Sequence, residues 1–224
     1  MEYMIIKYIS IFLALMVVLS FHEFAHAYAA VKNGDYTPKL MGRYTLNPLA
    51  HFDLVGLCCF ALVGFGWAKP VPVNPRNFNN YKKGSIWVAV AGVLANFVLA
   101  FITYPLHYLS LYLPSIGYFT EVLMLTLGYI HSFSLTFIVF NLLPIYPLDG
   151  FRLYDSLSNK RGKVYWFLRE KGMYVLYGLF FLGILSNALS IPQINVLGTI
   201  LDFLTNIIAF PITMFWMLIG GLII

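Results

Sequence analysis

The chain has 224 residues, of which 60% are hydrophobic and 10% are charged, and its formal net charge is +5. A soluble core of this size cannot bury so large an apolar fraction, so lipid must cover much of it. The composition therefore predicts a polytopic membrane protein. It excludes a soluble nucleic-acid-binding protein, because such a protein needs a basic surface exposed to water.

Five apolar stretches are each near or above the roughly 20 residues that a helix needs to cross a bilayer. They cover residues 4–31, 85–112, 116–141, 173–189 and 196–224. The first has no small-residue cleavage site followed by a polar region, so we expect a retained span and not a signal peptide. A sixth stretch, 54–67, is shorter and rich in glycine and cysteine, which is typical of a re-entrant or interfacial element. We therefore expect an all-α protein with about five spanning helices.

The basic residues predict the orientation of these spans. All Lys and Arg residues except Lys7 lie in residues 32–43, 69–83 and 152–171. Positive charge is retained on the cytoplasmic side, so these three segments should lie inside the cell. The first span then ends in the cytoplasm, and the short element at 54–67 begins and ends there without crossing. The expected location is the cell membrane, with multiple passes.

A His-Glu-x-x-His motif lies inside the first apolar stretch. On a helix, His22 and His26 are four residues apart, so both imidazoles project from one face and can share one metal ion. Glu23 lies about 100° around the same turn, where its carboxylate can accept a proton from water beside the metal. His and Glu are costly inside a bilayer unless they are paired or functional. The motif indicates zinc chemistry within a membrane, with a third ligand still to be found.

The predicted orientation indicates where that ligand must lie. His22 and His26 are six to ten residues before the end of the first span, which places the metal about 10–15 Å below the cytoplasmic boundary. The stretch 116–141 enters the same leaflet and is followed by two prolines and a glycine, which break the helix. Asp149 is the acid in this broken segment and is the candidate third ligand. The alternatives are a helix cap and an ion pair with Arg152.

His22-Glu23-Phe24-Ala25-His26 and the N-x-x-P-x-x-x-L-D-G pattern of residues 141–150 together resemble the site-2 protease family of intramembrane zinc metalloproteases. The similarity extends over about residues 15–155. The resemblance implies one Zn²⁺ per chain, held by His22, His26 and Asp149, with Glu23 as the general base. The active site would then lie near the cytoplasmic leaflet.

Further segments resemble one branch of this family. Residues 42–48 and 66–75 are similar to the compact bacterial branch, which lacks PDZ and CBS domains. Gly92 and Asn96 match a G-x-x-x-N element of an intermediate helix, although Val93 stands where a proline commonly follows the glycine.

Two asparagines are candidate substrate-binding residues. A peptide bond in a helix is shielded by its own turn, so a substrate must unwind before water can attack it. Asn96 and Asn141 could hold an extended substrate, because a carboxamide both donates and accepts hydrogen bonds. The alternatives are a bond between helices for Asn96 and a helix cap for Asn141. A strand within residues 54–73 to which the substrate pairs is a further hypothesis.

We therefore expect a single integral-membrane metalloprotease domain over residues 1–224, with a catalytic core over about 4–155 and additional C-terminal helices over about 173–224. The expected function is cleavage of peptide bonds within or near transmembrane segments of membrane-anchored proteins, in regulated proteolysis or in clearance of membrane remnants. The expected partners are a transmembrane helix of the substrate and the lipid bilayer, with no nucleic acid. The alternatives are a catalytically silent scaffold that binds helices and a metal or proton transporter.

Overall fold

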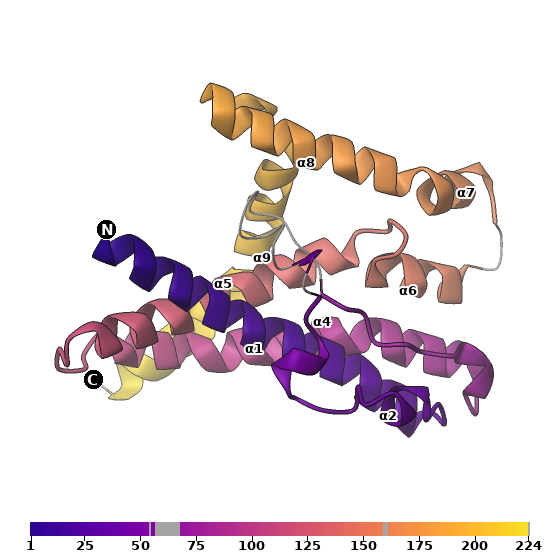
Figure 1. Cartoon of the computed structure of the whole chain (residues 1–224), viewed down its shortest axis with the longest axis horizontal. Coiled ribbons are helices and arrows are strands. Elements are labelled where there is room, and N and C mark those ends of the chain that lie inside the picture. The colour runs from indigo at the N-terminus through magenta and orange to yellow at the C-terminus, as the bar shows by residue number, and fades with distance from the viewer. Residues whose placement is uncertain (54, 57–67, 159–160, 224) are drawn as a thin grey trace.

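The computed structural model describes residues 1–53, 55–56, 68–158 and 161–223, and it is built from helices (Figure 1). Among these described residues, five helices are long and apolar enough to cross a membrane: α1 (Glu2–Lys32), α4 (Tyr81–Ser110), α5 (Tyr118–Leu142), α8 (Gly172–Leu189) and α9 (Val196–Ile223). The five predicted spans and the all-α class are confirmed. Shorter elements connect them: α2 (Thr37–Leu40), α6 (Asp149–Leu157), α7 (Lys163–Glu170) and the 3₁₀ turns Pro48–Ala50, Pro75–Asn77 and Pro192–Ile194.

Helices α1, α4 and α5 form the central bundle, in which α4 runs antiparallel to the other two (Figure 1). Small and β-branched residues lie at their contacts. Ala14 and Val18 of α1 pack against Ile130 of α5, and Ala30 of α1 packs in one buried cluster with Val88 of α4. Small side chains let helix backbones approach closely, which favours helix association in lipid through van der Waals contact.

Helix α9 packs across α4 and α5. Ile212 of α9 is buried with Ala100 and Leu135, and the indole nitrogen of Trp216 donates a hydrogen bond of 2.9 Å to the carbonyl oxygen of Phe101. An indole N–H needs a partner when it leaves water, and a backbone carbonyl of α4 supplies it. This contact fixes the C-terminal helix on the bundle.

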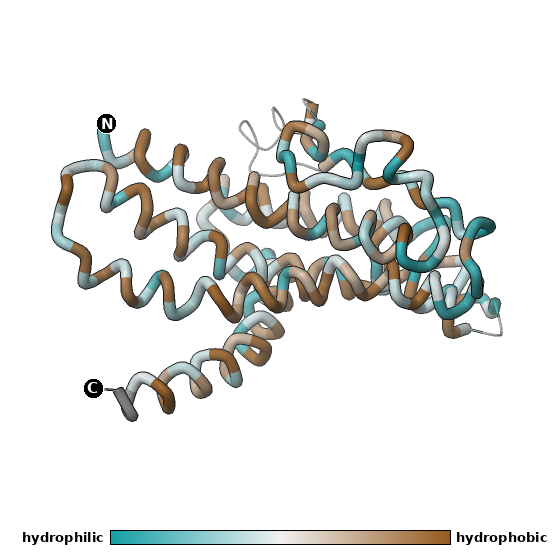
Figure 2. Tube along the Cα trace, turned by 90° about the horizontal axis from the view of Figure 1, so that it is seen from below, coloured by the Kyte–Doolittle hydropathy of each residue, from teal (hydrophilic) through white to brown (hydrophobic). Residues whose placement is uncertain are grey.

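Hydrophilic residues gather at the end of the bundle opposite the N-terminus (Figure 2). Here α1 ends, α4 begins, and the connection through α6 and α7 lies (Figure 1). The three basic segments thus share one end of the molecule. The assignment of this end to the cytoplasm stays a prediction.

The short element expected at 54–67 lies outside the described residues, apart from residues 55 and 56. Its flanks are described: Phe52 and Ala68 form an antiparallel bridge, and the backbone N–H of Lys69 donates to the carbonyl oxygen of His51 at 2.8 Å. The two flanks therefore lie side by side, and Phe52 packs its ring 6.2 Å from that of Phe12 in the first half of α1. The hypothesis of a substrate-pairing strand within 54–73 falls largely on residues outside the description and stays open.

A buried carboxylate joins the end of α1 to the segment that precedes α4. Asp35 is fully buried and accepts hydrogen bonds from the backbone N–H groups of Thr37 (3.1 Å) and Asn74 (2.7 Å), and from the side-chain amide of Asn77 (2.8 Å). Burial alone would raise the pKa of Asp35, but the hydrogen bonds from Thr37, Asn74 and Asn77 outweigh it and lower the pKa. The charged form of Asp35 therefore stabilises this connection.

We expect Asp35→Ala to lower the free energy of unfolding by about 3 kcal/mol, because the donors around the carboxylate lose their acceptor. A lowered pKa means that the stabilisation is present above the usual value of about 4 and is lost as the pH falls further. The difference between wild type and variant should thus shrink below about pH 4. Thermal unfolding in detergent at several pH values measures it. Glu170→Ala, at an exposed acid of α7, is the control, and an equal loss there would contradict a specific role for Asp35.

Candidate metal centre

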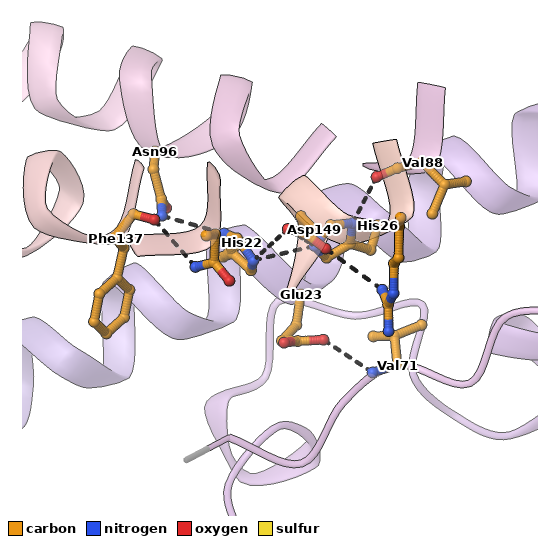
Figure 3. A network of polar contacts seen from close by, with 10 residues as sticks. His22, Glu23, His26, Val71, Val88, Asn96, Phe137 and Asp149 are labelled. Carbon is orange, nitrogen blue, oxygen red and sulfur yellow. Dashed lines mark hydrogen bonds and ion pairs between the residues drawn. The ribbon is translucent and has the colours of Figure 1, made fainter. Parts of the chain in front are cut away.

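His22 and His26 lie one turn apart on α1 and point into the bundle (Figure 3). Both are buried, with 5% and 3% of their surface exposed, and their Nε2 atoms are 3.1 Å apart. The four-residue spacing places both rings on one face of the helix, as the sequence predicts.

Asp149 reaches the same point from a different part of the chain. It is the first residue of α6, and its Oδ2 lies 3.3 Å from Nε2 of His22 and 3.0 Å from Nε2 of His26 (Figure 3). In the described part of the chain, these three residues are a group of side chains that could hold a metal ion. Arg152 approaches the other carboxylate oxygen, Oδ1, at 3.5 Å. The two alternatives for Asp149, a metal ligand and a partner of Arg152, thus use different oxygens of one carboxylate.

The position of Asp149 depends on the following glycine. A Cβ atom at Gly150 would lie 2.2 Å from the carbonyl oxygen of Leu142, at the end of α5. Only glycine allows the start of α6 to approach the end of α5 so closely. Phe151 then packs its ring 5.3 Å from the buried ring of Tyr165 in α7, which holds α6 from the other side.

The hydrogen-bond partners of both histidines favour the tautomer that can bind a metal through Nε2. Nδ1 of His26 lies 2.8 Å from the carbonyl oxygen of Val88, which can only accept, so Nδ1 carries the proton and Nε2 presents a lone pair. Nδ2 of Asn96 lies 3.2 Å from Nδ1 of His22, while Oδ1 of Asn96 is buried without a partner. Turning this carboxamide by half a rotation exchanges the two atoms and lets Oδ1 accept from Nδ1 of His22. Both imidazoles then direct Nε2 lone pairs at Asp149.

Three acceptors with no proton between them repel one another unless a cation lies among them. Oδ2 of Asp149 is buried and lacks a hydrogen-bond partner, which is consistent with this arrangement. A tetrahedral zinc site with bonds of about 2.0–2.1 Å places its ligand atoms about 3.3 Å apart. The observed separations of 3.0, 3.1 and 3.3 Å are close to that value. The residues present therefore fit a zinc ion with three protein ligands and one open position.

Gly92 of α4 forms the wall behind the two imidazoles. A Cβ atom built there would lie 2.5 Å from Cε1 of His22 and 2.5 Å from Nε2 of His26. Any side chain at this position would displace a ring. The G-x-x-x-N element thus places both of its residues against the histidines, the glycine by close approach and Asn96 by its carboxamide.

Glu23 lies beside the three candidate ligands but does not join them (Figure 3). Its side chain is partly exposed, and Oε2 accepts a hydrogen bond of 2.9 Å from the backbone N–H of Val71. Val71 stands between Pro70 and Pro72, so its N–H is the donor available in this short extended segment. This bond orients the carboxylate and leaves Oε1 for another partner.

Asn141, the other candidate substrate-binding residue, is bonded within its own helix, and two further histidines are bonded to backbone carbonyl groups. The side-chain amide of Asn141 donates to the carbonyl oxygen of Phe137, one turn back on α5, at 3.1 Å. His131 is bonded to the carbonyl oxygen of Ala100, and His51 to that of Thr45, so neither reaches the centre. Sequence reasoning missed the contacts of Val71 and Val88, because each acts through a backbone group that every non-proline residue carries.

We expect Gly92→Ala to lower zinc affinity by at least tenfold, roughly the effect of disturbing the outer shell of a metal site. The added methyl group forces His22 or His26 from its place. Competition for the metal with a chelator of known affinity measures the change. Gly178→Ala on α8, where a Cβ atom meets nothing within 4 Å, is the matched control. Unchanged zinc affinity in Gly92→Ala would show that the histidines do not bind the metal in this geometry.

Comparison with known proteins agrees with this chemistry. No family profile matches the chain, and no solved structure matches it. The chain is 37% identical over 154 residues to a protein of Bacillus subtilis named "Putative zinc metalloprotease YwhC", which covers 65% of this chain and 67% of that protein. It is 31% identical over 155 residues to "Putative zinc metalloprotease Rip2" of Mycolicibacterium smegmatis, covering 65% of this chain and 58% of that protein. With this identity over two thirds of YwhC, five apolar helices and a buried His-His-Asp centre, the chain belongs to the zinc metalloprotease family of YwhC and is a membrane member of it.

Proposed function

We propose that the protein is an intramembrane zinc endopeptidase of the site-2 protease type, which hydrolyses peptide bonds within or near transmembrane segments of membrane-anchored proteins. The observation that carries the proposal is the place of the centre. Its two histidines lie on a helix that is long and apolar enough to span a membrane, six to ten residues from the polar end. A substrate bond must therefore reach the ligands at membrane depth.

The chain's own residues supply the remaining chemistry. A zinc ion held by His22, His26 and Asp149 would polarise the peptide carbonyl and lower the pKa of a bound water. Glu23 lies beside these ligands, where it can accept the proton of that water and pass it to the departing amide nitrogen. The bond from Val71 keeps the Glu23 carboxylate oriented for this transfer.

The proposed site also has to hold an extended substrate. Asn141 lies at the end of α5, just before the break that leads to Asp149, and its carboxamide oxygen can accept from an unwound backbone. Asn96 is fully buried against His22, so we assign it first to the orientation of that ligand; its contact with substrate stays a prediction. The proposed setting is the cell membrane, with the centre nearer the cytoplasmic side.

We expect Glu23→Gln to retain zinc and to lose about 10²–10⁴-fold in the rate of cleavage, the usual contribution of a general base. Asp149→Ala should lose zinc and activity together. The measurements are cleavage of a panel of single-span substrates by the purified chain in detergent, and bound metal by elemental analysis. Glu121→Gln, the same change in the first turn of α5, is the control. No cleavage by the wild type would favour the scaffold or transporter, whereas cleavage by Glu23→Gln at the wild-type rate would show that Glu23 is not the general base.

Substitution of the two asparagines should affect different quantities, zinc affinity for Asn96 and substrate binding for Asn141. Asn96→Ala is expected to weaken zinc binding about 10- to 100-fold, because His22 loses the group that fixes its tautomer. Asn141→Ala is expected to keep zinc and to raise KM for the substrate. Chelator competition and steady-state kinetics measure the two effects. Full zinc affinity in Asn96→Ala with a raised KM would instead assign Asn96 to the substrate.

A further inference from the structure

A cavity of about 190 Å³ lies next to the metal centre, at the polar end of the bundle. The segment before α4, the first turns of α4 and helix α6 form its wall. The residues at its rim, such as Pro75 and Tyr81, are exposed, whereas Val71, Val88 and Ala89 deeper in the wall are buried. The cavity thus extends from an exposed rim to buried residues that contact the centre.

Three wall residues touch the proposed active-site residues. The N–H of Val71 is bonded to Glu23, the carbonyl of Val88 to His26, and the guanidinium of Arg152 lies 3.5 Å from Asp149. Only one wall residue therefore separates a group in the cavity from the proposed base and from two of the proposed ligands. This closeness places the cavity beside the bond to be cleaved.

The size of the cavity limits what it can hold. Sites for small molecules usually have about 300–1,000 Å³, which is larger than this cavity. A space of about 190 Å³ suits one or two amino-acid side chains. The occupant that fits is a short part of a substrate chain, flanking the bond that is cleaved.

The charges in the wall are not balanced. Asp155 accepts from the hydroxyl of Tyr165 at 2.7 Å and pairs with Arg161 at 3.3 Å. The Arg152 side chain is 41% exposed, and in the described part of the chain its recorded contact is the long one to Asp149, whose other oxygen faces the histidines. The hydroxyl oxygen of Ser85 is buried in the same wall without a partner. The cavity thus offers a guanidinium and a hydroxyl as available donors.

We propose that this cavity is a substrate subsite for an acidic side chain, with Arg152 as the specificity-determining residue and Ser85 as a second donor. The inference rests on the proposed protease function. A guanidinium binds a carboxylate through two parallel hydrogen bonds, and it repels Lys or Arg at the same substrate position. Transmembrane segments commonly carry Lys and Arg at their cytoplasmic ends, so on the proposed orientation this subsite rejects many membrane proteins.

The test uses a single-span substrate that the purified, zinc-loaded chain cleaves. Each of the four residues on either side of the cleaved bond is replaced in turn by Glu, Gln or Lys, and kcat/KM is measured. At one position the wild type should prefer Glu over Gln by about tenfold, as expected for a hydrogen bond to a charged group. Arg152→Gln should remove the preference, Arg152→Glu should reverse it towards Lys, and Arg152→Lys should retain part of it. Lys82→Gln, at an exposed lysine near the rim, should change nothing.

Two results would overturn the inference while the protease function stands: equal cleavage of all the substrates by the wild type, or a preference for Glu that survives in Arg152→Gln. Loss of zinc from Arg152→Gln would also overturn it, because Arg152 would then act only through Asp149. A binding experiment separates the subsite from the protease function. Fluorescent substrate helices that carry Glu or Gln at the tested position are bound to the zinc-loaded Glu23→Gln protein. Tighter binding of the Glu helix, lost on adding Arg152→Gln, supports the subsite even where the wild type cleaves nothing.

Discussion

The structure depends on bringing three unprotonated acceptors together inside a bundle of apolar helices. Two imidazole nitrogens and a carboxylate oxygen lie 3.0–3.3 Å apart, at positions that are at least 95% buried. Such a group is unfavourable in a medium of low dielectric constant unless a cation neutralises it. The surrounding fold serves this requirement: α1 provides two of the acceptors, α4 fixes their tautomers, and the break after α5 delivers the third.

Close approach of backbones makes this convergence possible. Gly92 brings α4 against both imidazoles, and Gly150 brings α6 against the end of α5, each at a distance where a Cβ atom would clash. In water such glycines would weaken the helices, but in lipid close packing replaces the hydrophobic effect as the force between helices. The same closeness lets backbone groups reach the centre. The carbonyl of Val88 and the N–H of Val71 set the states of His26 and Glu23 without any special side chain.

Much of the fold and of the candidate site could be predicted from the sequence. The five spans follow from runs of apolar residues whose length matches the bilayer, and the pair His22 and His26 follows from helical periodicity. The helix break before Asp149 follows from Pro144 and Pro147. The contacts of Val71, Val88 and Arg152 could not be found in this way. They join segments that are distant along the chain, and two of them use the backbone, which leaves no signal in the choice of residue.

The sequence by itself thus determined the class of protein, the number of candidate spanning helices and the chemical types of the candidate ligands and base, because these depend on local composition and on spacing within one helix. Only the tertiary structure decided that Asp149 turns one oxygen to the histidines and the other to Arg152, that Asn96 reaches His22, and that a cavity opens beside the centre. These features depend on distances between α1, α4 and α6. Such distances are set by how side chains pack between the helices, and no single segment encodes them.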